Sequence, residues 1–432
     1  MKHTFFKESV IYGFTGALSN FSVFLTIPVY TRYLSVEQFG VLDLYLTISM
    51  IFYILLEMQM ASGFMRSYYE KKESGKLDLL LGSVLKFYIY SFTFAVLLFT
   101  ILYLSNYNSK YFIYSYIVPI ILYILPKQIF DLNNIIMRME HQAIQYLKFN
   151  IYGTFFITIL SVVFVLFKSS IESVLWSIFF GNAIVGYFAY KNIKKLIGIK
   201  LNFVYLKEIA YYGIPIIPAV IGGWAMNAIG RVYISEYLNN FDLGLYSFAL
   251  KIGMIFLLFI QAFRMAWEPF VIKKFGEEAT NSKEIFAKAL NYYFILGFII
   301  VGIIYIITPF LIKILATKQY LSSISIVPML LLAYFWQGAI NIIAVGNSWV
   351  RKTYLNSIGS LVGALTVILF SFLLIQQYKL YGVALAQIIG FITSFFITMY
   401  FAQKNVYIGY SKSSIVMSLI LTIILISSNW RV

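Results

Sequence analysis

The sequence has no cysteine and only two histidines, His3 and His141. Without cysteine, the chain can form no disulfide, no thiol nucleophile and no thiolate metal site. Both histidines fall in segments that we expect in water, and two are too few for a histidine-based metal centre. The sequence therefore predicts no metal and no cofactor.

Charged residues are also scarce, at 12% of the chain, whereas hydrophobic residues make up 61%. An ordinary soluble domain is about half apolar and about a quarter charged. The 36 tyrosines and 41 phenylalanines are typical of rings that lie at membrane interfaces and pack between helices. No long polar segment separates the apolar runs, so we expect no soluble domain. The composition predicts an integral membrane protein.

Apolar runs long enough to cross a bilayer occur along the whole chain. A span needs about 20 such residues, and the runs predict an all-α protein with about 12 transmembrane helices. The runs lie near residues 9–31, 41–65, 80–104, 112–130, 149–167, 174–190, 209–231, 245–270, 291–312, 325–346, 355–375 and 383–403. A shorter run over residues 415–428 is a thirteenth span, a re-entrant segment or an interfacial helix.

Lysine and arginine gather in alternate connections between the predicted spans. With the N-terminus in the cytoplasm, most of the 33 basic residues fall in cytoplasmic loops, such as the segments 66–76, 191–207 and 273–288. This positive-inside pattern predicts a cytoplasmic N-terminus. It also accounts for the net charge of +16, so no nucleic-acid partner is expected.

A short connector occurs twice in the sequence. Residues 33–41 read YLSVEQFGV and residues 237–245 read YLNNFDLGL, and both copies run from a Tyr-Leu pair through one acid to a glycine, Gly40 or Gly244. Each copy follows the first helix of a six-helix half. Because six is even, both halves begin on the same side of the membrane, which predicts two bundles related by a pseudo-two-fold axis along the membrane normal. A chance match between aromatic-rich helices is the alternative.

The repeat predicts the domain boundaries. An N-terminal six-helix bundle would span residues 1–208 and a C-terminal one residues 209–404, and a tail with the short hydrophobic segment would follow over residues 405–432. Prolines in the lead helix of each half are candidate hinges, because proline removes a helical hydrogen bond and bends the helix. The hinge candidates are Pro28, Pro215 and Pro218, with static kinks as the alternative.

Charged and amide side chains inside the spans are candidates for a binding site, because polar groups are costly in hydrocarbon. Lys251, Gln261 and Arg264 fall on one face of the helix expected over residues 245–270. Arginine can hold a diphosphate or an acidic sugar through two parallel hydrogen bonds. Pairing of Arg264 with Glu268 is the alternative. The substrate-binding candidates are Arg264, Lys251, Gln261, Lys86, Asn227 and Asn291.

Two acids inside the spans, Glu57 and Asp43, are candidates for coupling transport to an ion gradient. Glu57 lies at the same expected depth as Lys86, so a structural ion pair is the alternative for it. Asp43 lies near the outer end of its span, where water reaches it. For an anionic cargo, the membrane potential is an alternative driving force that needs no proton-carrying acid.

Two stretches of the chain resemble a known family: IPVYTRYLSVEQFGVLDLY near the N-terminus, and YYGIPIIPAVIGGWAMNAIGRVYISEYLNNFDLGLYSFALKIG at the start of the second half. They are similar to the polysaccharide transporter branch, with its O-antigen (Wzx-type) flippases, of the multidrug/oligosaccharidyl-lipid/polysaccharide exporter superfamily. The resemblance covers nearly the whole chain but has no catalytic signature.

The resemblance implies a two-bundle flippase of the bacterial inner membrane, and no enzyme. Its cargo would be an undecaprenyl-diphosphate-linked O-antigen or polysaccharide repeat unit, moved from the cytoplasmic to the outer leaflet by alternating access. It further implies a place in lipopolysaccharide or polysaccharide biosynthesis. The implied partners are the lipid-linked oligosaccharide, membrane lipid, and polymerase and chain-length proteins.

Two alternatives to this function remain open. A multidrug exporter of the same superfamily would share the helices and the repeat, but its cavity should favour acids, whereas basic and amide groups outnumber acids in these spans. A glycan polymerase or glycosyltransferase should carry catalytic acids or arginines on a large outer loop, and the sequence predicts no long outer loop.

Overall fold

The computed structural model describes residues 2–105, 113–198, 202–274 and 279–429. Within these residues every regular element is a helix, and none is a strand. Ten of the helices found there are long and apolar enough to cross a membrane. The predicted all-α, multi-pass membrane fold is confirmed.

The chain forms two compact units. Unit 1 consists of Met1–Leu34 and Leu42–Val220, and unit 2 of Ser35–Val41 and Ile221–Val432. The chain enters unit 2 briefly at Ser35, returns to unit 1 at Leu42, and passes to unit 2 again at Ile221, inside the first helix of the second half and beyond the boundary at 208/209 that the repeat predicts. The division falls later because Phe203–Gly213, at the start of the second half, packs on helices of unit 1.

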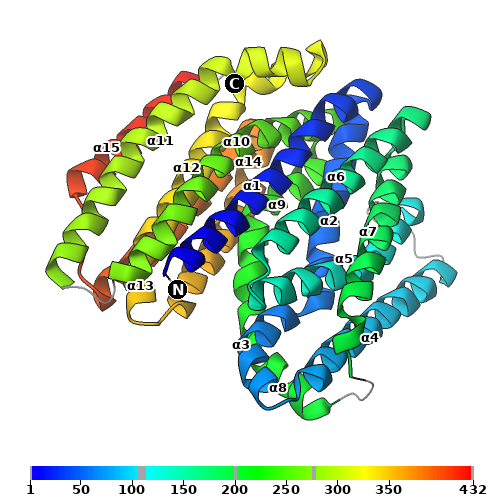
Figure 1. Cartoon of the computed structure of the whole chain (residues 1–432). Helices are drawn as coiled ribbons and strands as arrows, with labels where there is room; N and C mark the ends of the chain where they lie inside the picture. The colour runs from blue at the N-terminus through cyan, green and yellow to red at the C-terminus, as the bar shows by residue number, and fades with distance from the viewer. Residues whose placement is uncertain (1, 106–112, 199–201, 275–278, 430–432) are drawn as a thin grey trace. The chain divides into compact units, whose positions relative to one another are not determined.

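Unit 1 contains the helices from α1 to α8, apart from the start of α2 up to Val41, which belongs to unit 2. In chain order these are α1 (Lys2–Tyr33), α2 (Val36–Glu57), α3 (Met60–Glu73), α4 (Leu77–Leu104), α5 (Tyr114–Met139), α6 (Ala143–Phe167), α7 (Ile171–Ile193), the 3-10 helix η1 (Lys194–Leu196), α8 (Phe203–Gly213) and the 3-10 helix η2 (Ile214–Ile216). α1 packs along α6, and α5 packs along α7 (Figure 1). The short helices α3 and α8 pack on each other and on α4, around a core that includes Phe64, Tyr68 and Ile209.

Two predicted spans of unit 1 have wrong ends. The run over residues 41–65 is not one helix, because the backbone turns at Met58 and Gln59, which both have a positive φ. α2 therefore ends at Glu57, and the separate helix α3 follows. The span predicted over residues 112–130 ends too early. The helix α5 continues to Met139, with polar side chains in its second half.

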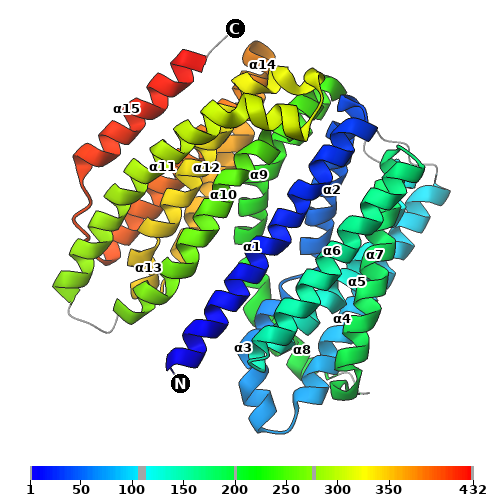
Figure 2. The same cartoon turned by 45° about the horizontal axis from the view of Figure 1, so that its top comes forward.

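Unit 2 contains the remaining helices. They are α9 (Ile217–Tyr237), of which the first turn lies in unit 1, α10 (Asn240–Lys274), α11 (Ala279–Leu315), the 3-10 helix η3 (Lys318–Ser325), α12 (Val327–Ile343), α13 (Val345–Trp349), α14 (Tyr354–Asn405) and α15 (Lys412–Asn429). α14 holds two predicted spans, separated by a break at Lys379 with φ 47°. α12 packs between α10, α11 and α14 (Figure 2).

The short hydrophobic segment near the C-terminus forms α15. This helix packs on α12 and α11 (Figure 2). The indole nitrogen of Trp336 in α12 donates a hydrogen bond of 3.2 Å to the hydroxyl of Thr422 in α15. The segment is thus an integral part of unit 2.

The two copies of the connector meet inside unit 2. Ser35–Val41 belongs to this unit although it precedes most of α2, and its Gly40 lies against Gly244 of the second copy. A methyl group on Gly40 would lie 2.8 Å from Gly244 Cα, much closer than ordinary van der Waals contact. The glycines therefore recur because two helix starts come together backbone to backbone.

The polar residues of the connector cap these helix starts. Ser35 N–H donates to Gln38 Oε1 at 3.1 Å, and Gln38 N–H donates to Ser35 Oγ at 3.2 Å, which is a reciprocal capping box. In the second copy, Asp242 N–H donates to the side-chain oxygen of Asn239 at 2.8 Å. Each copy thus combines a helix cap with a glycine contact.

Candidate functional site

A line of polar side chains follows one face of α5 in unit 1. Tyr123, Lys127, Asp131 and Asn134 recur every three or four residues, so they share that face. We call these four residues the α5 polar stripe. It lies in a helix long and apolar enough to span a membrane, where polar groups need partners.

The centre of the stripe is an ion pair. Lys127 Nζ lies 2.5 Å from Asp131 Oδ1, one helical turn away, and the hydroxyl of Tyr53 in α2 donates to Asp131 Oδ2 at 2.7 Å. The side chains of Lys127 and Asp131 are 35% and 30% exposed. The pair is therefore held in place and still accessible from one side.

The ends of the stripe pair with α2 and α6. The hydroxyl of Tyr123 donates to Ser49 of α2 at 3.1 Å. Asn134 and Asn150 of α6 exchange two side-chain hydrogen bonds, at 3.1 and 2.9 Å. Gln128, also in α5, is buried, and neither of its amide atoms has a partner among the described residues.

Sequence reasoning missed both charges of this pair. Lys127 fell inside the run predicted over residues 112–130, and Asp131 fell just outside it. A lysine and an acid four residues apart can pair on a helix, which was the available signal.

Glu57, a predicted coupling residue, is almost fully buried at the end of α2. Its carboxylate accepts hydrogen bonds from the backbone N–H groups of Gln59 and Ala61, at 2.8 and 2.7 Å, and from the hydroxyl of Tyr88 at 3.2 Å. Those N–H groups belong to the start of α3, so Glu57 caps that helix across the turn at Met58 and Gln59. This structural use suffices to account for a buried acid here.

The other predicted coupling and binding residues of unit 1 are Asp43 and Lys86. Asp43 is buried in α2, and its backbone oxygen accepts a hydrogen bond from Thr47. Lys86 is half-buried in α4. Roles for Asp43 in coupling and for Lys86 in binding or in an ion pair remain hypotheses.

A buried arginine marks the polar interior of unit 2. Arg231 of α9 is 9% exposed, and its Nη1 donates to the backbone oxygen of the predicted residue Asn227 at 3.0 Å. The side chain of Asn227 donates in turn to Gly223 O at 2.9 Å. Nearby in the same unit, buried Tyr246 of α10 donates to Gln387 of α14 at 3.1 Å. Arg231, the last residue of the span predicted over residues 209–231, was not among the charges singled out from the sequence.

The candidates on α10 and α11 are spread along the unit. Lys251 and Gln261 are half-buried, Arg264 is exposed, and Asn291 of α11 has a buried side-chain oxygen without a partner among the described residues. Lys251 and Arg264 are thirteen residues apart, which is about 20 Å along a helix. One diphosphate cannot contact both at once, so they would meet different parts of a cargo or different stages of its path.

The predicted hinge prolines occupy different settings. Pro28 lies inside α1, where Arg32 donates to its backbone oxygen at 2.9 Å. Pro215 lies in η2 and Pro218 in the first turn of α9, just before the chain enters unit 2 at Ile221. Pro215 and Pro218 therefore break the helix close to the passage at Ile221, and Pro28 precedes the passage at Ser35.

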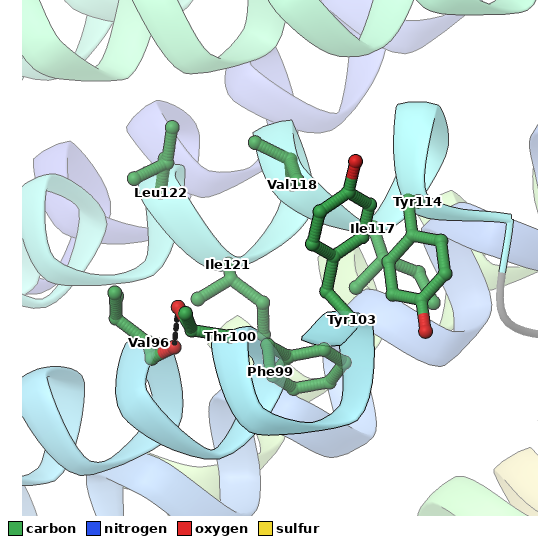
Figure 3. A pocket seen from close by; sticks show the side chains of 9 residues that line it. All are labelled: Val96, Phe99, Thr100, Tyr103, Tyr114, Ile117, Val118, Ile121 and Leu122. Carbon is green, nitrogen blue, oxygen red and sulfur yellow. Dashed lines mark hydrogen bonds between the residues drawn. The ribbon is translucent and has the colours of Figure 1, made fainter. Parts of the chain in front are cut away.

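A separate pocket in unit 1 is apolar (Figure 3). It has a volume of about 280 Å³ between α4 and α5. Its lining includes Phe99, Ile117 and Leu122, and the hydroxyl of Thr100 at its edge bonds to Val96 O of its own helix, as the dashed line shows (Figure 3). Such walls suit hydrocarbon and offer little to sugars or phosphates.

The described residues contain no group of three or more His, Cys, Asp or Glu side chains that could hold a metal ion.

Comparisons with known proteins agree with this architecture. A model of the family described as "Polysaccharide biosynthesis protein" matches residues 6–275, more than half of the chain. A Haemophilus influenzae protein named "Uncharacterized membrane protein" is 24% identical over 323 residues, which cover 73% of this chain and 74% of that protein.

Two solved structures are similar in fold. A structure titled "Lipid II flippase MurJ, inward closed conformation" has a TM-score of 0.74 and 16% identity, and the match covers 98% of this chain and 93% of that one. An inward-facing multidrug resistance MATE family transporter of the MOP superfamily has a TM-score of 0.72 and 12% identity, with coverage of 90% and 97%.

Proposed function

This chain belongs to the polysaccharide biosynthesis protein family, and we propose that it is a flippase for a lipid-linked oligosaccharide. Its cargo would be an undecaprenyl-diphosphate-linked O-antigen or polysaccharide repeat unit. Transport would run from the cytoplasmic to the outer leaflet of a bacterial inner membrane, with the N-terminus of the chain in the cytoplasm. The family match is the observation that carries the proposal, and the fold shared with a lipid II flippase supports it.

The glycan is the part of such a cargo that resists transfer. A hydroxyl taken from water into a medium that cannot hydrogen-bond costs about 4–8 kcal/mol, so a short glycan would cost tens of kcal/mol in bare lipid. The spans of both units supply partners for hydroxyls. In unit 1 these are the α5 polar stripe and the buried Gln128, whose amide atoms lack partners among the described residues. In unit 2, Asn291 offers a buried amide oxygen.

The diphosphate needs cations along its path. Arg231 places a buried guanidinium in unit 2, and Lys127 places a part-exposed ammonium in unit 1. Lys251 and Arg264 remain candidates for direct contact with the diphosphate or an acidic sugar. Arginine suits this role because its planar fork matches two phosphate oxygens.

Alternating access requires bending where the chain passes between its units. Pro215 and Pro218 interrupt the helix just before that passage, which favours a hinge there. The membrane potential would assist an anionic cargo by about 2.3 kcal/mol per charge per 100 mV as it leaves a negative interior. Glu57 and Asp43 would then not be needed as proton carriers.

A multidrug exporter is the second candidate function. The similarity of fold to a MATE family transporter favours it, as does the accessible carboxylate of Asp131. Against it stands the family match, and the carboxylate of Asp131 is already paired with Lys127.

Reconstitution distinguishes the two functions. The full chain in liposomes should move a fluorescent undecaprenyl-diphosphate-linked oligosaccharide between leaflets, faster with a potential of the physiological sign. In cells, Arg264→Ala and Lys251→Ala should each reduce surface glycan at unchanged protein level, whereas the exposed Lys168→Ala, outside the spans, should not. If the reconstituted chain transports cationic drugs but does not move the lipid-linked glycan between leaflets, the flippase proposal is refuted.

A further inference from the structure

A second pocket in unit 1 is polar and lies where helices end. α3, α5 and α7 end around it, and α4 and α6 begin there. Its volume is about 770 Å³. Apolar side chains, among them Ile136, Met137 and Ile193, form part of the wall, and polar side chains form the rest. It shares no lining residue with the apolar pocket between α4 and α5.

The charges of this pocket leave a positive excess. Lys72 Nζ donates to both carboxylate oxygens of Glu140 at 2.7 Å, so these two charges neutralise each other. Lys148 is exposed at the pocket and, among the described residues, forms no ion pair. Further lysines at 191, 194 and 195 lie on the segment that contributes the lining residue Asn192. The pocket therefore attracts anions.

Amide side chains around the pocket have unused hydrogen-bonding capacity. Asn133 is 1% exposed, and among the described residues its amide donates only to the sulfur of Met137, at 3.8 Å, which is a weak acceptor. Gln142, Gln145 and Asn192 also line the pocket, and within the described part of the chain their side chains form no hydrogen bond. Amides both donate and accept, which is what a hydroxyl group requires.

The start of α6 adds to the positive potential. Its N-cap residue, Gln142, makes no side-chain cap, and its first turn contains no acid. The first N–H groups of this 25-residue helix and the positive end of its dipole therefore receive no cap from Gln142, and they lie beside Gln142 and Gln145 of the pocket. Lys148 follows one turn later.

We propose that this pocket binds the phosphorylated, hydroxyl-bearing headgroup of a membrane lipid. Lys148 and the start of α6 meet the phosphate, the amides meet the hydroxyls, and the apolar wall meets the first carbons of the tail. Lipid is the source because the pocket lies at the ends of α4, α5, α6 and α7, all long enough to span a membrane, where headgroups lie.

Two lipids carry this chemistry, an anionic phospholipid and the phosphate-sugar end of a polyprenyl-linked glycan. The site does not depend on transport, so it stands or falls separately from the proposed flippase activity. We expect it to hold a lipid beside unit 1 in either case.

The test measures binding to the full chain in nanodiscs of phosphatidylcholine. One arm adds phosphatidylglycerol, and the other adds an undecaprenyl-diphosphate-linked saccharide; lipid retained on the protein is counted by native mass spectrometry. Lys148→Gln should weaken retention about tenfold, the effect of one lost charge-assisted hydrogen bond. The control Lys168→Gln removes the same charge at the other end of α6 and should leave retention unchanged.

A second variant tests the hydroxyl contacts. Asn192→Leu should reduce retention of phosphatidylglycerol but not of phosphatidate, whose headgroup has no glycerol. Retention in only one arm of the main experiment identifies the source and supports the site. Equal losses in Lys148→Gln and Lys168→Gln, or no retention beyond phosphatidylcholine in either arm, would overturn the proposal.

Discussion

Gly40→Ala should destabilise the protein, although alanine is the better helix former. Gly40 lies in the first turns of α2, and the added methyl group would sit 2.8 Å from both Gly244 Cα and the carbonyl carbon of Leu243. Ordinary van der Waals contact begins at 3.4 Å. The obstacle is backbone and not a flexible side chain, so the two helix starts must move apart by about half an ångström or more.

Two opposing contributions set the size of the effect. Overpacking of this kind costs about 1–3 kcal/mol, or more where the backbone cannot yield. Replacing glycine by alanine inside a helix returns about 0.5–1 kcal/mol. The capping box of Ser35 and Gln38 holds the same turn in place and limits relaxation. We therefore expect a net loss of about 1–2 kcal/mol in the free energy of unfolding.

The measurement is the thermal unfolding midpoint of purified protein in detergent, compared with the same substitution in open space. A methyl group on Gly16 of α1 or Gly223 of α9 would meet no atom within 4 Å. Gly16→Ala and Gly223→Ala should keep or raise the midpoint, whereas Gly40→Ala lowers it. A Gly40→Ala midpoint at or above that of the unchanged protein would show that the connector contact is not tight.

Three further predictions concern charge and topology. Asp131→Asn should cost about 1–2 kcal/mol of stability because Lys127 loses its carboxylate partner at a part-exposed site. Adding Lys127→Gln to this variant should recover part of the lost stability. Strictly additive losses of the two substitutions in unfolding experiments would count against the ion pair. Lys72 lowers the pKa of the Glu140 carboxyl through its hydrogen bonds to the charged form. The stability that the charged Glu140 contributes is complete above the ordinary pKa of 4.5 and is lost as the pH falls through the lowered pKa. Glu140→Gln should therefore make thermal stability less dependent on pH in the acid range. An unchanged pH profile would contradict this. A reporter that is active only outside the cytoplasm should be active when fused after Asn240, and its silence there would reverse the proposed orientation.

The sequence alone predicts the membrane class of this protein, because a span requires a stretch of apolar residues of a certain length, and length and hydropathy are properties of the linear chain. The repeated connector could be read in the same way, with its glycines and cap residues. The division of the chain into α2 and α3 could not. It depends on the carboxylate of Glu57 reaching the N–H groups of Gln59 and Ala61 across a turn, in a run that hydropathy leaves uninterrupted.

Only the tertiary structure decided which polar residues act together. The sequence did not single out Lys127 and Arg231, which lie inside predicted spans, or Asp131, which lies just beyond one. Their significance comes from partners far away in the chain, such as Tyr53, 78 positions before Asp131. A hydrogen bond depends on distances between helices that no single helix specifies. Periodicity therefore shows which face of a helix is polar, and the packing of neighbouring helices determines what that face binds.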